Sequence, residues 1–461
     1  MKKKLFFYSL GIIILVIVIF TAICFCKKDT KSTKKLEATV IAIDNDSISV
    51  QDNNNIIYTF NNQTINTNIG DKIVIEYTGL LNKNYNIQDN EIIDYTIATI
   101  EKNENGIPKS WLDDGIFSQY YILANDKLQE LTLEEKISQL LLVRYPDNNP
   151  IGELVKYQFG GYLFFEKDFK DKTKKEVQNM MTSLQKNAKI PILTAVDEEG
   201  GKVVRISSNP NLVSEKFKSS QQLYALGGFE TIKNDTINKS NLLNSLGINL
   251  NLAPVVYVST NPNDYMYERS FGQNTELTST YAKTVINASK NLGVSYTLKH
   301  FPGYGNNYDT HNGITVDNRD YDDIVNNDLP PFKAGIDVGA EAVLVSHNIV
   351  ANIDSSNPAS LSTSIHNLLR NELNFTGIII TDDLAMGAIS SINNATIKAI
   401  LSGNDLIITT DYIESINEIK TAINDGTISE DLIDKLAFRV LAWKYYKGLM
   451  FINKYDDIFI L

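Results

Sequence analysis

The chain has 461 residues, of which 43% are hydrophobic and 21% are charged, and this balance excludes a wholly disordered protein. A net charge of −12 disfavours a general nucleic-acid binder, which needs a basic surface. The two cysteines, Cys24 and Cys26, lie in an apolar N-terminal stretch, so the rest of the chain has neither a disulfide framework nor a cysteine-based zinc site. No cofactor or metal ion is expected, and the sequence indicates no oligomeric state.

The N-terminal residues predict a membrane anchor. Residues 5–26 carry no charge, and at about 1.5 Å per helical residue they span roughly the thickness of a bilayer core. We expect residues 1–26 to form an uncleaved transmembrane signal-anchor, with a cleaved signal peptide as the alternative. Residues 27–36 are a charged tether. This arrangement predicts a single-pass protein of the cell membrane whose remaining residues lie outside the cytoplasm.

A small all-β domain is expected over residues 37–100. Apolar and polar residues alternate there, β-branched residues are frequent, and Asp-Asn turn signals separate the segments. This pattern predicts about five strands in a barrel-like, OB-like unit. It contains no stripe of basic and aromatic residues and does not indicate a role. Residues 101–125 are expected to be a connector.

Residues 126–461 alternate short apolar runs with helical patterns, which predicts a parallel sheet. The eight runs are SQLLLVRY, GGYLFFEKD, IPILTAVDEEGG, GINLNLAPVVYV, GVSYTLKHFPG, AEAVLVSHN, FTGIIITDDL and NDLIITT. Eight such units favour a (β/α)8 TIM-type barrel, with an open doubly wound sheet as the alternative. No G-x-G-x-x-G follows the first run, so a dinucleotide site has no support.

Catalytic groups of such barrels lie at the carboxyl ends of strands and in the loops that follow them. The polar residues at these positions are Asp197, Glu198, Glu199, Arg269, Lys299, His300, Asp309, His311, His347, Asp382 and Asp383. His366 instead lies on a predicted helix and is expected to be a surface or capping histidine. From residue type alone, Asp382 is either a nucleophile or a helix N-cap, because adjacent Asp383 can take the other role. Asp309, two residues before His311, can orient the imidazole for proton transfer.

Several motifs in order resemble glycoside hydrolase family 3, most closely its NagZ-type β-N-acetylhexosaminidases. They are VDEEGGKVVR, ERSFG, KHFPGYG with the following DTH, and TDDLAMGAI, and the likeness covers roughly residues 126–450. The resemblance implies a (β/α)8 barrel and removal of terminal β-linked N-acetylglucosamine with retention of configuration. The β-glucosidase branch usually adds a second α/β domain that supplies a glutamate acid, whereas this sequence ends soon after the expected barrel and has the D-T-H loop; both points favour the hexosaminidase branch.

The same resemblance assigns roles to residues of this chain. Asp382 matches the nucleophile, and His311 matches the general acid/base with Asp309 as its partner. Asp197, Arg269, Lys299 and His300 match the groups that hold the sugar's hydroxyl and acetamido groups. The chain departs from the family pattern at Tyr304, usually His, at Lys202, usually Arg, and in the shortened segment between Gly305 and Asp309.

We therefore expect an exo-acting β-N-acetylglucosaminidase that cleaves peptidoglycan-derived glycans or muropeptides, with a covalent glycosyl–Asp382 intermediate. The altered loop leaves a non-catalytic module that binds cell-wall sugars as one alternative. A phosphorylase is a second alternative, since a neutral imidazole repels an anionic acceptor less than a carboxylate does. A β-glucosidase or β-xylosidase of the same family is the third.

Overall fold

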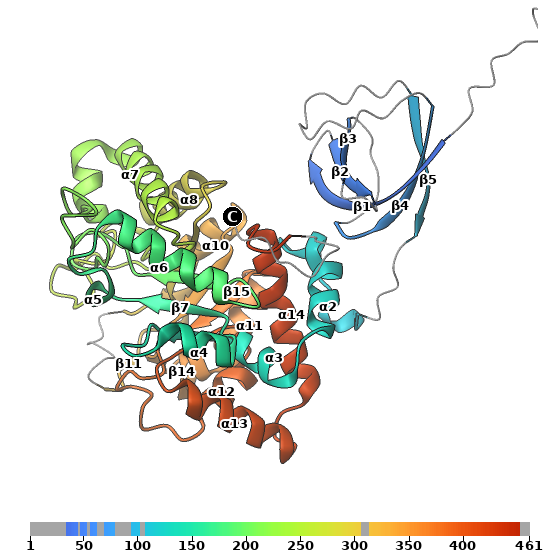
Figure 1. Ribbon diagram of the computed structural model, residues 1–461. Helices are drawn as coiled ribbons and strands as arrows, with labels where there is room; N and C mark the ends of the chain where they lie inside the picture. Colours follow the sequence, from blue (N-terminus) through green and yellow to red (C-terminus); the bar gives the residue numbers. More distant parts are fainter. Residues whose placement is uncertain are drawn as a thin grey trace, which may run out of the picture. The chain divides into compact units, whose positions relative to one another are not determined.

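The structure is a computed structural model that describes residues 34–44, 47–52, 56–61, 69–78, 94–101, 107–305 and 313–451. Contacts divide the chain into two compact units, one ending at Asn103 and one beginning at Glu104, and each is described by itself (Figure 1). Among the described residues, no helix combines the length and apolarity needed to cross a membrane. The expected anchor, residues 5–26 with Cys24 and Cys26, lies outside them.

The first unit is a five-stranded antiparallel sheet in the order β3-β2-β1-β4-β5. Its strands are β1 (Lys34–Asp44), β2 (Ser47–Asp52), β3 (Ile57–Asn61), β4 (Lys72–Thr78) and β5 (Asp94–Glu101). Alternation buries one set of side chains, including Val40, Val50, Phe60 and Ile75, as period-2 patterning requires. Strand β1 begins within the residues expected to form the tether.

The second unit contains an all-parallel, nearly closed barrel of eight strands in the order β15-β12-β10-β9-β8-β7-β6-β16. The strands are β6 (Leu141–Arg144), β7 (Gly161–Phe164), β8 (Leu193–Val196), β9 (Leu250–Asn251), β10 (Ser295–Phe301), β12 (Ala342–Val345), β15 (Ile378–Thr381) and β16 (Ile407–Thr409). A parallel bridge between Ile380 and Leu406 joins the ends of this order. Every predicted apolar run contains one strand, so the barrel prediction is confirmed.

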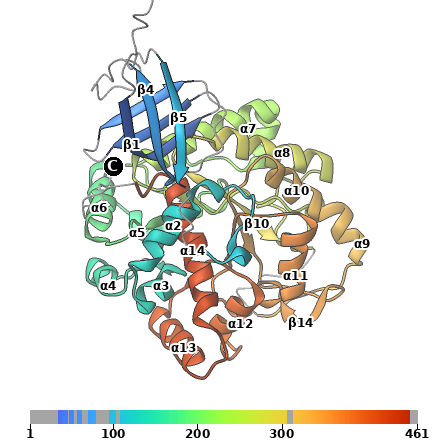
Figure 2. The ribbon, with the colours of Figure 1, turned by 90° about the vertical axis from the view of Figure 1, so that its right-hand side faces the viewer.

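Helices surround the barrel (Figures 1 and 2). They are α2 (Tyr121–Gln129), α3 (Leu133–Gln139), α4 (Pro150–Tyr157), α5 (Glu166–Phe169), α6 (Lys174–Asn187), α7 (Ser220–Ser245), α8 (Thr275–Ser289), α9 (Tyr321–Asp323), α10 (Leu329–Asp337), α11 (Thr363–Asn367), α12 (Ala395–Ser402), α13 (Tyr412–Asn424) and α14 (Glu430–Tyr446). Several begin at side-chain caps; Thr132 and Thr173 each form a capping box with a glutamate three residues later.

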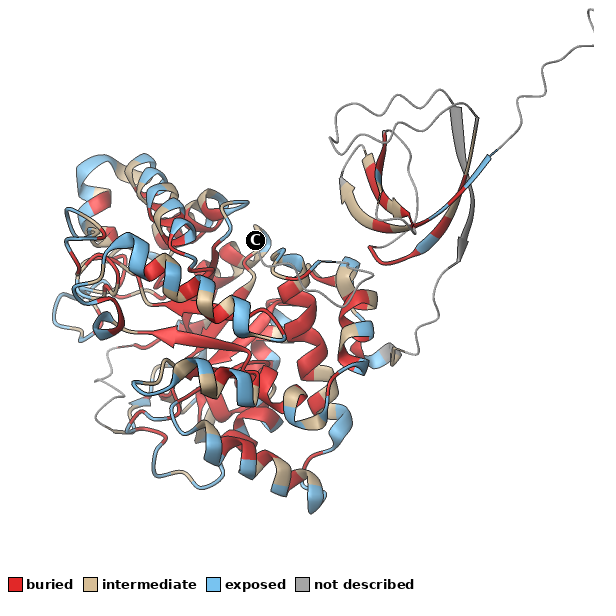
Figure 3. Ribbon diagram, in the orientation of Figure 1, coloured by how far each residue is buried: buried red, intermediate tan, exposed pale blue. Residues whose placement is uncertain are grey.

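The barrel core is built from strands that are buried on both faces (Figure 3). All four residues of β7, β8, β12 and β15 are buried, which explains why these runs are continuously apolar rather than alternating. Most of the charged residues predicted for the site come where these strands end or in the loops that follow, although Lys299 lies within β10. A small three-stranded sheet, β11 (Val316–Asp317), β13 (Ile349–Val350) and β14 (Asp354–Pro358), lies in the segments after β10 and β12.

The segment from residue 107 to α2 packs on helix α14. Trp111 and Tyr121 contact the ring of Phe438, and Phe117 contacts that of Tyr446. Trp111 and Phe117 are buried. These apolar contacts make the segment part of the same core as the barrel.

Candidate active site

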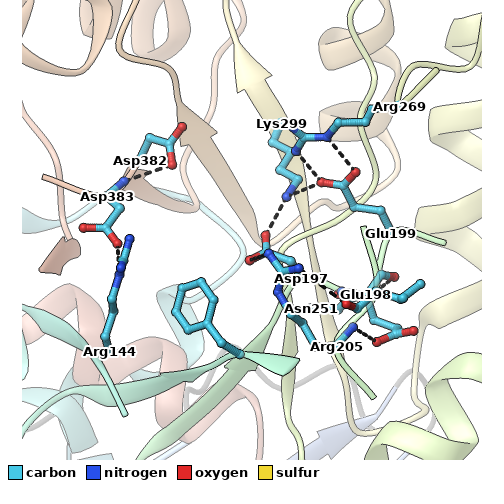
Figure 4. A network of polar contacts seen from close by, with 12 residues as sticks. Arg144, Asp197, Glu198, Glu199, Arg205, Asn251, Arg269, Lys299, Asp382 and Asp383 are labelled. Atoms are coloured by element: carbon cyan, nitrogen blue, oxygen red, sulfur yellow. Dashed lines mark hydrogen bonds and ion pairs between the residues drawn. The ribbon is translucent and has the colours of Figure 1, made fainter. Parts of the chain in front are cut away.

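Two acids after strand β8 and two basic residues from elsewhere form one ion-paired cluster, which we call the cation–carboxylate cluster. It consists of Asp197, Glu199, Arg269 and Lys299 (Figure 4). The Lys299 ammonium, on β10, lies 2.7 Å from both Asp197 and Glu199. Arg269 donates to both oxygens of Glu199, at 3.1 and 2.7 Å. The structure thus brings together three of the residues predicted to bind the sugar, and adds Glu199.

The charges of the cluster stabilise one another. Burial alone would raise the pKa of Asp197, but the Lys299 and Arg205 cations outweigh it and hold that pKa below its usual range. Burial likewise opposes ionisation of Glu199, yet Arg269 and Lys299 lower its pKa to about 2. Both carboxylates are therefore ionised acceptors at neutral pH. Together with the cationic donors, they provide the mixed hydrogen bonds that a neutral sugar requires.

Glu198, between these acids, points elsewhere and fixes the backbone. Its carboxylate accepts hydrogen bonds from the backbone N–H groups of Arg205 and Ile206, each at 2.7 Å, and from Ser207. The Glu198 N–H donates to Asn251 at the end of β9. Glu198 thus sets the conformation of the VDEEGGKVVR turn, and places Arg205 with its Nη2 3.5 Å from Asp197.

Asp382 and Asp383 differ in how the surrounding residues hold their carboxylates. Asp383 accepts from the Ala385 N–H at 2.9 Å within a turn and is ion-paired with Arg144; the next helix begins only at Ala395, so Asp383 is not a helix N-cap. Asp382 follows β15 directly and is half-buried. Its Oδ1 accepts from the Asp383 N–H, and no described residue bonds to its Oδ2. Asp382 therefore keeps a carboxylate oxygen available at the carboxyl-terminal rim of the barrel.

Asp383 is held by Arg144, which the sequence analysis did not name, and by His347, which it named only among the polar residues that follow strands. Arg144, at the end of β6, donates from Nε to Asp383. His347, after β12, is fully buried, with its Nε2 2.9 Å from the Asp383 carbonyl and its Nδ1 2.7 Å from Ser360 Oγ. Because a carbonyl can only accept, His347 carries its proton on Nε2. Arg144 and His347 are 239 and 36 residues from Asp383 in sequence, and only the strand order could have identified these pairs.

His300 lies in an aromatic group next to the cluster. Its ring centroid is 6.2 Å from that of Tyr257 and 5.7 Å from that of Tyr304, and all three side chains are buried. Tyr304, which stands where the resemblance expects histidine, is thus part of the packing around His300. The Lys299–His300 and Phe301–Pro302 peptide bonds are cis.

The backbone conformation and close packing of the FPGYG segment require glycine at two positions. Gly303 and Gly305 have φ values of 141° and 58°, which non-glycine residues rarely adopt. A Cβ on Gly303 would lie 2.7 Å from a carboxylate oxygen of Asp328, and one on Gly305 would lie 2.9 Å from Arg319. The Asp328–Arg319 ion pair therefore packs directly against this turn.

The remaining sequence predictions have mixed outcomes. Asp309 and His311 lie outside the described residues, so the proposed acid/base pair stays a prediction. Lys202 points to the surface and is paired with Glu268, away from the cation–carboxylate cluster. His366 lies on α11 as expected but is buried, with Nδ1 2.8 Å from the Ser362 carbonyl, so it is not a surface histidine. In the described part of the chain, no group of three or more His, Cys, Asp or Glu side chains is arranged to hold a metal ion.

Comparisons with known proteins agree with this geometry. Residues 132–443 match the model of the glycosyl hydrolase family 3 N-terminal domain. Beta-hexosaminidase LpqI of Mycobacterium tuberculosis is 31% identical over 269 residues, which cover 55% of this chain and 68% of that protein. A beta-hexosaminidase of Xylella fastidiosa is 27% identical over 312 residues, 65% of this chain and 89% of that protein. The solved structure of a family 3 beta-N-acetylglucosaminidase from Paenibacillus superposes with a TM-score of 0.65 at 28% identity, covering 69% of this chain and 63% of that one.

Proposed function

The chain belongs to glycosyl hydrolase family 3 and is a glycoside hydrolase; from that premise we propose that it removes terminal β-linked N-acetylglucosamine with retention of configuration. One observation carries the proposal. Asp382 holds a free carboxylate oxygen at the same end of the barrel as the cation–carboxylate cluster. A sugar held by its hydroxyl groups in the cluster presents its anomeric carbon to that oxygen.

The proposed mechanism has two steps, which share one covalent intermediate. In the first, Asp382 Oδ2 attacks the anomeric carbon while the protonated imidazole of His311 gives its proton to the departing glycosidic oxygen. In the second, neutral His311 takes a proton from water, whose oxygen attacks the same carbon and releases Asp382. Asp309 orients the imidazole throughout. The roles of His311 and Asp309 come from their match to the family motif.

The natural substrate and location are also part of the proposal. Homologues named beta-hexosaminidase support an N-acetylhexosaminide as substrate. Residues 5–26 support attachment to the cell membrane with the barrel outside the cytoplasm, where peptidoglycan-derived glycans and muropeptides are found. No cofactor or nucleic acid takes part in the proposed reaction.

The test is p-nitrophenol release from the β-N-acetylglucosaminide and from the β-glucoside, with and without phosphate. We expect the chain to cleave the first substrate faster and Asp382→Asn to lose at least about a thousandfold in rate, as removal of a nucleophile does. Faster cleavage of the glucoside would contradict the N-acetylglucosaminidase proposal. Sugar phosphate among the products would make the protein a phosphorylase. A folded protein with no turnover on either substrate would favour a non-catalytic sugar-binding module.

A further inference from the structure

Two arginines at the carboxyl-terminal rim of the barrel have donor groups that the protein does not use. Arg144 donates only through Nε, and no described residue accepts from its Nη1 or Nη2. Arg205 makes two long hydrogen bonds, from Nη1 to the Val204 carbonyl at 3.4 Å and from Nη2 to Asp197 at 3.5 Å, and its buried Nε has no partner. A guanidinium carries five N–H donors, so both side chains retain unused hydrogen-bonding capacity.

The ring of Phe165 contacts both cations, of which Arg144 ends the neighbouring strand β6 and Arg205 lies in the loop after β8. The Arg144 and Arg205 Cζ atoms are 4.9 and 5.3 Å from its centroid. Phe165 follows β7, which pairs with β6 on one side and with β8 on the other, and its N–H donates to Asp168 at 2.7 Å. Attraction between a guanidinium and an aromatic face keeps each cation oriented in the absence of a ligand.

Both guanidinium groups reach solvent in part, since the Arg205 side chain is 22% exposed although its Nε is buried. The Arg144 side chain is 35% exposed, whereas its partner Asp383 is only 7% exposed, so solvent meets the cation rather than the carboxylate. Asp197 has its close ion pair with Lys299 at 2.7 Å, and its contact with Arg205 is long. An oxyanion would satisfy these donors with short, charge-assisted hydrogen bonds, for which the arginine fork is suited.

We propose that Arg144, Phe165 and Arg205 form an oxyanion subsite, which binds a carboxylate or phosphate group during the reaction of the enzyme. The inference rests on the proposed function and specifies its substrate class as an anionic N-acetylglucosaminide, or a neutral one with an anionic acceptor. The subsite adjoins the sugar through the contact of Arg205 with Asp197, and adjoins Asp382 through the pair of Arg144 with Asp383. Figure 4 shows Arg144 with Asp383 and Asp382 on one side of the site and the cluster on the other.

Three sources of the oxyanion are distinguished by matched substrates on the full chain. The first pair is aryl β-N-acetylglucosaminides that carry a carboxylate or a carboxamide on the leaving group. The second pair is the 4-nitrophenyl glycoside with and without a phosphate ester on the sugar's 6-hydroxyl. In the third arm, inorganic phosphate is added to the neutral glycoside and sugar phosphate is measured.

Arg144→Gln removes the charge while keeping a side chain of similar length. We expect the kcat/KM ratio of the anionic over the neutral substrate, or the yield of sugar phosphate, to fall about tenfold or more in one arm, the usual effect of losing a charged hydrogen bond. The arm that responds identifies the source. The ratio is the readout because Arg144 also holds Asp383. Loss of that ion pair should change kcat/KM by the same factor for both substrates of a pair and so leave their ratio unchanged. Arg144→Lys keeps the charge without the fork and should give an intermediate ratio.

Lys167→Gln is the matched control, because it removes a cation two residues after Phe165 that is exposed and paired with Asp147. It should leave every ratio unchanged. Calorimetric binding of inorganic phosphate to the wild type and to Arg144→Gln tests the subsite without turnover. Binding weakened about tenfold supports the subsite even if no N-acetylglucosaminide is cleaved, which would refute only the proposed function. Equal phosphate binding and unchanged ratios in an active enzyme would overturn the subsite alone.

Discussion

Charge pairing of individual residues governs how the site responds to acid. The Glu199 carboxylate is buried between Arg269 and Lys299, and its pKa of about 2 lies below the ordinary value of 4.5. Because the folded state holds the ionised form more strongly than the unfolded state does, Glu199 stabilises the fold fully above pH 4.5. This contribution is lost as the pH falls towards 2.

Replacing Glu199 should therefore change the acid limb of the stability curve. We predict that Glu199→Gln lowers the free energy of unfolding at pH 7 by about 3 kcal/mol. The substitution removes the ion pairs of Glu199 and leaves the buried Arg269 and Lys299 cations with less negative charge beside them. The loss should shrink as the pH approaches 2. Urea unfolding between pH 2 and pH 7 measures it. The exposed Glu130, replaced by Gln, should change stability by less than about 0.5 kcal/mol at every pH; an equal effect of both substitutions would contradict this explanation.

Where helix α14 packs against α3, it buries the cationic side chain of Lys444. Lys444 is fully buried and donates to the neutral amide of Gln139 of α3 at 2.6 Å. Burial lowers the pKa of Lys444 to about 7. Since the unfolded chain binds this proton more strongly, the free energy of unfolding rises as the pH rises from about 7 to 10.5. Below pH 7 the folded protein bears the full energetic cost of burying the charged ammonium.

Removing this cation should stabilise the interface between α14 and α3. We predict that Lys444→Met raises the free energy of unfolding by about 2–4 kcal/mol at pH 6, and by much less at pH 10, because an apolar side chain of similar length has no charge to desolvate. Denaturant melts at the two pH values test this. Lys420→Met removes a surface lysine paired with Glu134 and is the control. A gain that does not depend on pH would show that burial of the charge is not the cause.

Across the whole molecule, the sequence predicted those features that local pattern determines. The eight barrel strands were identifiable because buried strands are short apolar runs that end in polar residues. Asp197, Lys299 and Asp382 could be assigned to one face because all parallel strands end there. The family resemblance was also recognisable, because it rests on short motifs of consecutive residues.

Partners distant in sequence could not be predicted in the same way. The pair Arg144–Asp383 joins residues 239 positions apart, and it depends on closure of the barrel, which leaves only β16 between β6 and β15. The packing of Trp111 and Phe117 on α14 likewise has no periodic signal, so that segment resembled a connector. Arg205 was hidden within a recognised motif, because only its distance from Asp197 and its unpaired Nε reveal unused donors.

The central claim is that Asp382 forms a covalent bond to the sugar, and mass spectrometry tests it most directly. A fluorinated N-acetylglucosaminyl donor, which slows the second step more than the first, is mixed with the chain, and the protein is digested and sequenced. The account predicts one sugar attached to the peptide that contains Asp382 in the wild type, and none in Asp382→Asn. A label on another carboxylate, or no label while the donor is turned over with inversion of configuration, would contradict it.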